Sequence, residues 1–274
     1  MTVRELGRLL EEVRPLSETR RARLPAFERR ARTIVAGLTV LHTALTVLGA
    51  REAVVSEGAL REGMMIEELR RHAAYASGLS ARQRSALALA ERFGANLAHA
   101  RHVTALSREL FDQLCQAGAE LPPQGRGLLK AAATLHEVGQ LIAQSGHHKH
   151  SAYLIRHGGL RGFTPAEIEV IAQVARYHRR SLPKASHPEY AALSAEDRRL
   201  VDQLSAILRV ADGLDRSQAS GSKVRRLERS GNGWRLEVTA ANALDLAGAE
   251  SKADLWEREF GPLNIAALEV RRVR

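Results

Sequence analysis

The sequence predicts a mainly α protein: a central helical bundle, preceded by an α-β-α segment and followed by a small α+β tail. Apolar residues recur at helical spacing through most of the stretch from residue 80 to 218. Beyond the polar linker QASGS the spacing changes to alternation with period two, which is typical of strands. Because 274 residues exceed what one hydrophobic core usually organises, we expect three domains, at 1–75, 80–218 and 223–274.

The first domain is predicted to place helices around one short strand. A charged helix runs from Thr2 to Val13, and a long apolar helix at 33–48 stops at Gly49. A buried strand follows at 53–56, and a glycine-bearing turn then leads to another helix. One strand cannot form a sheet, so we expect its pairing partner to be missing from this chain or to belong to another chain.

The central domain is predicted to be a set of antiparallel helices around an aliphatic core. Thr164 precedes Pro165 and Glu167, which together predict a capped helix start, and Ser194 opens the last helix in the same way. Cys115 is the one cysteine, so an internal disulfide is excluded, and its apolar helical setting predicts a buried thiol. The helical runs are ARQRSALALAERFGANLAHARHVTALSRELFDQLCQAG, GRGLLKAAATLHEVGQLIAQ, HSAYLIRHG, TPAEIEVIAQVARYH and SAEDRRLVDQLSAILRVADGLDRS.

The tail is predicted to be a small α+β unit. The stretch KVRRLERSGNGWRLEVTA alternates with period two around Asn232-Gly233, which predicts a β-hairpin. A helix, AESKADLWEREFG, and a last alternating run, NIAALEVRRVR, complete it. This part contains no histidine and no evident catalytic grouping.

Charge and composition limit the partners. The formal charge of +10 favours acidic partners such as phosphate polymers. Aromatic residues make up only 4% of the chain, which argues against a base-stacking surface, so we expect no sequence-specific nucleic-acid partner. No apolar stretch approaches the roughly 20 residues that span a bilayer, and the N-terminus lacks the pattern of a secretory signal. We therefore expect a cytoplasmic protein with no membrane partner.

Histidines and acids stand out at helical positions of the central domain. Imidazole and carboxylate are ligands that divalent transition metals accept, and a helical bundle can point such groups at one centre. The pattern has two interpretations, one of which is a site for a divalent metal (Mn, Mg or Fe) that converts water to hydroxide. The alternative is polar packing, in which the same groups hydrogen-bond one another. The six candidates are His99, His136, Glu137, His150, His178 and Asp212.

Basic residues follow the same stretch of sequence. Guanidinium groups bind phosphate in a forked geometry, and an ammonium group binds it as a point charge. We expect His147 and His148 to lie in a loop, where they are solvated or contact phosphate. The candidate phosphate-binding residues are Lys149, Arg176, Arg179 and Arg180.

The order His, His-acid, His, His, Asp resembles the HD-domain phosphohydrolases, with Glu137 in place of the aspartate. The flanking residues LHEVG, SGHHKHSAYLI and YHRR are similar to the C-terminal helical region of the exopolyphosphatase and guanosine pentaphosphate phosphatase (Ppx/GppA) family. LRVADGLDRS and ESKADLWEREFG extend this resemblance, and RARTIVAGLTVLHTALTVLG resembles the end of the family's second actin-like subdomain. The resemblance implies an HD-domain-like helical bundle preceded by a remnant of an actin-like subdomain.

The resemblance also implies where catalysis resides. In the family, phosphoanhydride hydrolysis belongs to an N-terminal actin-like half with glycine-rich phosphate loops, and this sequence contains no such loop. We therefore expect a natural truncation, a displaced start or one half of a split protein. Such a chain would work as a homodimer or with a separate actin-like partner chain.

Three functions remain open at this point. The first is a Ppx/GppA-type protein that engages polyphosphate or guanosine polyphosphate with its HD-like domain and hydrolyses little by itself. The second is an autonomous metal-dependent phosphohydrolase of the HD type. The third is a non-catalytic interaction or dimerisation module.

Overall fold

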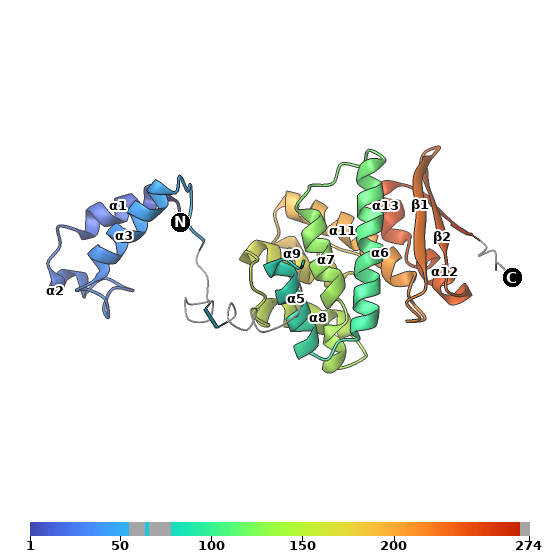
Figure 1. Cartoon of the computed structure of the whole chain (residues 1–274), viewed down its shortest axis with the longest axis horizontal. Coiled ribbons are helices and arrows are strands. Elements are labelled where there is room, and N and C mark those ends of the chain that lie inside the picture. The colour runs from blue at the N-terminus through green and yellow to red at the C-terminus, as the bar shows by residue number, and fades with distance from the viewer. Residues whose placement is uncertain (55–63, 66–77, 269–274) are drawn as a thin grey trace. The chain divides into compact units, whose positions relative to one another are not determined.

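The computed structural model describes residues 1–54, 64–65 and 78–268. The chain divides into two compact units, Met1–Tyr75 and Ala76–Arg274 (Figure 1). Helices dominate both units, and the described strands of regular length all lie in one small sheet near the C-terminus. The predicted fold class, mainly α with an α+β tail, is confirmed.

The first unit contains α1 (Val3–Val13), α2 (Glu18–Arg21) and α3 (Ile34–Val47). Its core consists of Leu6, Leu10 and Leu38 with a few partly buried neighbours. The predicted strand at 53–56 is described only at its start, where the Ala53 amide donates to the Met1 carbonyl at 2.9 Å. The rest of that strand, and most of the turn and helix predicted after it, lie outside the described residues.

The ends of α1 and α3 follow from local chemistry. The Thr2 side chain accepts from the Glu5 amide, and the Glu5 carboxylate accepts from the Thr2 amide, so both partners of a capping box are present. Gly49 has a φ of +63°, a conformation that glycine adopts without steric cost, and it follows the end of α3 as the sequence predicts.

The second unit packs its helices around α11. From Leu200 to Gly213 all but one residue of this helix is buried, because neighbouring helices and the tail surround it. Thr164 and Ser194 cap the two helices for which the sequence predicts them. The helices before the tail are α5 (Ala81–Arg92), α6 (Leu97–Gln116), α7 (Gly125–Leu135), the 3₁₀ helix η1 (Val138–Leu141), α8 (His147–His157), α9 (Pro165–Arg176), α10 (Pro188–Ala191) and α11 (Ala195–Gly213).

Two predicted helical runs are interrupted. The first is split at Gly94, which has a φ of +64°, into α5 and α6. The second ends at Leu135 and continues as η1. A Cβ on Gly139 of η1 would lie 2.1 Å from the His147 carbonyl oxygen, so only glycine allows η1 to pack this closely on α8. This interruption places His136 and Glu137 at a helix end.

Cys115 differs from its prediction. It lies on α6 as expected, but its side chain is exposed, so the expectation of a buried thiol is wrong. Leu114, next to it, is the residue that turns into the core.

The tail consists of β1 (Lys223–Ser230), β2 (Gly233–Thr239), α12 (Ala243–Glu250), α13 (Asp254–Phe260) and β3 (Leu263–Ala267). The hairpin of β1 and β2 is confirmed, but its turn is formed by Gly231 and Asn232, and Gly233 pairs with Ser230 inside the ladder. β3 runs parallel to β2, and the helix predicted over 249–261 corresponds to α13, whereas most of α12 lies before the predicted helix.

The tail and the helical bundle share one core. Trp234, Leu255 and Trp256 of the tail belong to the same cluster of buried residues as the helices. Figure 1 shows the hairpin beside α6, and α12 and α13 pack on α11. None of the described helices is both long and apolar enough to cross a membrane.

Candidate functional site: a histidine and carboxylate cluster

The ends of four helices converge on a buried cluster in the second unit. His99 comes from the first turn of α6, and His136 and Glu137 directly follow α7. His178 follows α9, and Asp212 lies in the last turn of α11. The four side chains other than Glu137 are each at most 8% exposed, so water is largely excluded from their contacts.

Three histidines of the cluster are held by the same local device. Each places Nδ1 against the carbonyl oxygen three residues earlier in the chain. The N–H of a neutral imidazole then lies on Nδ1, which leaves the lone pair of Nε2 free to face the cluster. The pairs are His136 with Ala133 at 2.8 Å, His147 with Gln144 at 3.1 Å, and His178 with Ala175 at 2.7 Å.

His99 is oriented by a carboxylate instead. Its Nδ1 donates to Asp215 Oδ2 at 2.8 Å, and Asp215 is fully buried. Its Nε2 lies 3.6 Å from Glu137 Oε2 and 3.4 Å from Asp212 Oδ1. Burial lowers the pKa of His99, but the carboxylates of Asp212 and Asp215 outweigh it and raise that pKa to about 10.

Three buried atoms of the cluster have no hydrogen-bond partner among the described residues: His99 Nε2, His136 Nε2 and Glu137 Oε2. These residues also offer ligand atoms that all lie within 4.8 Å of one another. Buried polar atoms without partners are costly, and two imidazoles with one carboxylate form a donor set that divalent metals accept. The three residues present therefore fit a divalent cation.

A lysine from the tail reaches the same cluster. Lys252 lies between α12 and α13, and its ammonium group donates to Asp212 Oδ2. The other oxygen of that carboxylate, Oδ1, lies 3.5 Å from His136 Nε2. Burial raises the pKa of Asp212, but the charge of Lys252 and contacts with the two histidines hold it well below its ordinary value.

Ser151 fixes the segment that carries the His-Glu pair. Its hydroxyl donates to the His136 carbonyl at 2.7 Å and accepts from the Gly139 amide at 2.9 Å. The two backbone groups lie on either side of the junction between α7 and η1, where helical hydrogen bonds are interrupted. One buried serine on α8 therefore satisfies the two groups that position His136 and Glu137.

The structure brings His147, rather than His150, to the predicted cluster. His147 is 1% exposed, and its Nε2 lies 3.3 Å from His178 Nε2. His147 and His148 begin α8, so the prediction that they lie in a loop is wrong. His150 is half-buried and makes none of the hydrogen bonds or ring contacts found for the cluster within the described part of the chain. Tyr177 is buried, but its hydroxyl bonds to His187 at 2.7 Å.

The predicted phosphate-binding residues lie around the start of α8. Burial, together with the positive charges of His147, Arg179, Lys149 and Arg176, lowers the pKa of His148 to about 4. Lys149 is exposed, and Arg179 is half-buried with its guanidinium 3.3 Å from His147 Nδ1. Of the remaining two predicted residues, Arg176 is ion-paired with Glu189 at 2.9 Å, and Arg180 is exposed at a φ of +62°.

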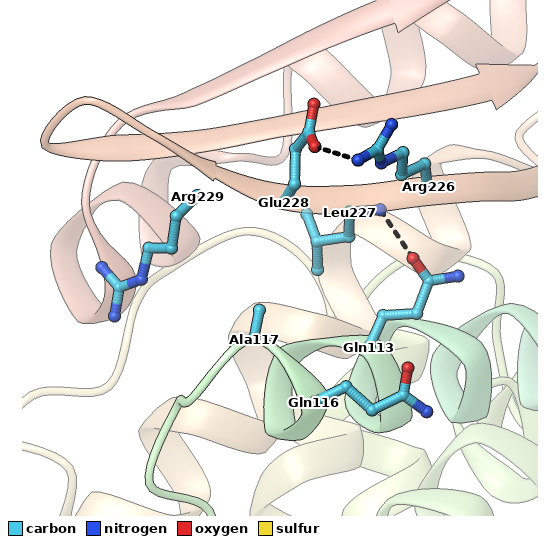
Figure 2. A pocket seen from close by; sticks show the side chains of 7 residues that line it. All are labelled: Gln113, Gln116, Ala117, Arg226, Leu227, Glu228 and Arg229. Carbon is cyan, nitrogen blue, oxygen red and sulfur yellow. Dashed lines mark hydrogen bonds and ion pairs between the residues drawn. The ribbon is translucent and has the colours of Figure 1, made fainter.

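A pocket elsewhere in the second unit contains neither the histidines of the cluster nor the basic residues at the start of α8. It lies between the end of α6 and β1 (Figure 2). Figure 2 shows Gln113 directed at β1, where its carbonyl oxygen accepts from the Leu227 amide at 2.6 Å, and Glu228 paired with Arg226 at 2.8 Å. Gln113, Arg226 and Glu228 thus make contacts within the lining of the pocket, and the contact of Gln113 with Leu227 joins the tail to the bundle.

Sequence reasoning missed three residues of the cluster: His147, Asp215 and Lys252. The sequence held a signal for Asp215, which lies three residues after Asp212 and so on the same face of the helix end. It held none for Lys252, because only the tertiary packing of the tail on α11 brings that lysine close.

Two family models match the chain. The model described as Ppx/GppA phosphatase, domain III, matches residues 81–255, and the model described as Ppx/GppA phosphatase family matches residues 1–72. Their boundary agrees with the division of the chain into two units near residue 75.

Similar proteins carry the name guanosine-5'-triphosphate,3'-diphosphate pyrophosphatase. The one from Photobacterium profundum is 36% identical over 171 residues, which are 61% of this chain and 32% of that protein. The one from Vibrio campbellii is 33% identical, over 60% of this chain and 32% of that protein. The one from Pseudoalteromonas translucida is 30% identical, over 67% of this chain and 35% of that protein. The chain thus spans about a third of the length of these relatives.

Proposed function

The chain belongs to the Ppx/GppA phosphatase family, and on that basis we propose that it engages polyphosphate or a guanosine polyphosphate through the basic residues beside its histidine cluster. The relatives are named for action on a guanosine polyphosphate, and the resemblance of the sequence to exopolyphosphatases implies polyphosphate as the other ligand. Both ligands present a run of phosphate groups, which is the chemistry that the basic residues would recognise.

The observation that carries this proposal is the positive charge around His148. Lys149 and Arg179 have no carboxylate partner among the described residues, in contrast to Arg176. Arginine and lysine without an acidic partner bind phosphate oxygens through charge-assisted hydrogen bonds. The α8 helix also begins here without a side-chain cap, so the first amides of the helix add to the positive potential.

We further propose that the chain hydrolyses little of its ligand alone. The three relatives are about three times as long as the stretch that they share with this chain. Phosphoanhydride hydrolysis would then need an actin-like portion in addition to the residues described here. The basic residues of this chain would bind the phosphate chain, and the actin-like portion would hydrolyse it.

The test is calorimetric titration of the chain with polyphosphate of defined length and, separately, with guanosine pentaphosphate. The double variant Lys149→Ala with Arg179→Ala should bind at least about tenfold more weakly, because each lost charge-assisted hydrogen bond contributes roughly 1.5 to 3 kcal/mol. Its affinity should also fall less steeply with salt. Phosphate release, measured in parallel with and without Mn²⁺, should remain low.

The matched control removes one lysine and one arginine from β1, Lys223→Ala with Arg229→Ala. Both side chains are exposed and belong to a different surface of the same unit, so this variant should bind like the original chain. Equal binding by all three proteins would refute the proposed site. An absence of binding in the original chain would favour the non-catalytic interaction module.

A second candidate function is a metal-dependent phosphohydrolase, which the convergence of three unpartnered atoms favours. His99, His136 and Glu137 would hold the cation, and a bound divalent cation supplies Lewis acidity toward phosphate. Arg179 and Lys149 would orient the substrate. Phosphate release that depends on added Mn²⁺ in the same assay would favour this candidate over the first.

A further inference from the structure

We infer that Lys252 is a built-in cation that competes with a divalent metal ion for the histidine and carboxylate cluster, so that the C-terminal tail controls metal occupancy. The inference rests on the second candidate function, in which the cluster holds a metal. It concerns a residue outside the helical bundle, which the predicted site does not include.

One carboxylate connects the tail to the cluster. Asp212 turns Oδ1 toward His99 and His136, at 3.4 and 3.5 Å, and Oδ2 accepts from the Lys252 ammonium. A protonated lysine has three donors and no acceptor, so it cannot be a metal ligand. It withdraws one carboxylate oxygen from the cluster and adds a positive charge next to it.

The position of Lys252 is set by contacts on both sides of it. On the α12 side, the buried Asp245 carboxylate accepts from the Ser217 amide at 2.8 Å, just after α11. On the α13 side, Arg209 of α11 donates to both oxygens of Asp254, each at 3.0 Å. The segment between α12 and α13 is therefore fastened to α11, and the lysine is presented to Asp212 by the fold.

Electrostatic repulsion between the two cations means that the presence of one weakens the binding of the other. Asp212, which contacts both the Lys252 ammonium and the cluster, is only 6% exposed. Like charges repel more strongly in such a buried region than in water. A divalent ion among His99, His136 and Glu137 would meet this repulsion while Lys252 stays in place. Binding of the ion would require Lys252 to leave Asp212, or would be weakened while it remains.

The experiment compares full-length chains by titration with Mn²⁺ and, separately, with Zn²⁺. Lys252→Met keeps the aliphatic part of the side chain and removes the charge, and it should bind the ion at least about tenfold more tightly than the original chain, the scale of effects from residues next to metal ligands. Lys252→Arg keeps the charge and should bind as weakly as the original chain. Lys223→Met, an exposed tail lysine, is the matched control and should change nothing.

Melting gives a second readout that does not depend on enzymatic activity. Without metal, Lys252→Met should melt below the original chain, because Asp212 loses its counter-ion, and saturating Mn²⁺ should restore much of the loss. Adding His136→Ala to Lys252→Met should abolish this rescue. If Lys252→Met does not fold, Lys252→Gln, which keeps a donor for Asp212, carries the same expectation.

Two results would overturn the inference. Equal affinity of the original chain and Lys252→Met would mean that the cluster binds metal without competition from the tail. Binding of neither ion by either protein would mean that Lys252 and Asp212 form a structural ion pair. The latter result leaves the phosphate-binding proposal intact, because that proposal is measured by polyphosphate affinity in the absence of metal.

Discussion

Ser151 shows how a single residue holds the cluster in place. Its hydroxyl serves the His136 carbonyl and the Gly139 amide at once, and the side chain is fully buried. Ser151→Ala would leave two backbone groups without partners in a site that water cannot reach. We expect the free energy of unfolding to fall by about 2 kcal/mol, measured by urea denaturation.

Ser107 provides the matched control. It is also a fully buried helical serine, but its hydroxyl has no partner among the described residues. Ser107→Ala removes an unsatisfied polar group and should leave stability unchanged or slightly higher. A loss for Ser107→Ala as large as that for Ser151→Ala would show that the volume of the hydroxyl, and not its hydrogen bonds, explains the effect.

The histidines of α8 show how much of the cluster could be predicted from the sequence. The sequence predicted the helix α8. Which of its histidines joins the cluster, however, depends on where the helix begins and on which face is buried. His147 lies one turn before the buried Ser151, and Ile155 lies one turn further on, so the three share one face. His150 directly precedes Ser151 and so lies about 100° from it around the helix. Period 3.6 counted back from Ile155 reaches positions 147 and 148 and passes over His150, whereas the family order alone selected His150.

At the scale of elements, α11 and α12 meet backbone to backbone. A Cβ on Gly213 would lie 2.6 Å from both the Ala249 amide nitrogen and the Gly248 carbonyl oxygen. Gly213→Ala must therefore push α12 away from α11, and with it the segment that carries Lys252. We expect a loss of about 1 to 3 kcal/mol in the free energy of unfolding, measured by denaturation.

Gly127 is the control for this prediction. It lies in the first turn of α7, it is exposed, and a Cβ there would meet no atom within 4 Å. Gly127→Ala should stabilise the protein by roughly 0.5 to 1 kcal/mol, because alanine favours the helix and restricts the unfolded chain. A gain from Gly213→Ala instead would mean that α12 moves aside without cost.

The tail shows why element boundaries were harder to predict than element types. The sequence distinguished helix from strand in the tail, because alternation and helical spacing differ. It placed the hairpin turn one residue late, and it began one helix at Ala249, through the break between α12 and α13, without predicting the rest of α12. Both errors arise from close packing: Gly233 pairs within the ladder, and the break at Ala253 lets Leu255 and Trp256 enter the shared core. Such packing depends on partners that are distant in sequence.

At the scale of the whole second unit, the bundle and the tail share one core, although the sequence suggested separate domains at 80–218 and 223–274. Trp256 of α13 is fully buried against that core. Ion pairs from Arg209 to Asp254 and from Lys252 to Asp212 join the two parts further. We therefore expect residues 78–268 to unfold in a single transition.

Trp256→Ala tests this expectation. Loss of a buried tryptophan should lower the free energy of unfolding by about 3 to 5 kcal/mol. Hydrogen exchange measured by mass spectrometry should then rise by similar factors in peptides from the middle of α7 and of β2, because a shared core makes their slowest exchange depend on the same global unfolding. Faster exchange confined to β2, with α7 unchanged, would show that the tail unfolds alone. In that case the Lys252 ammonium could leave Asp212 while the histidine cluster stays folded.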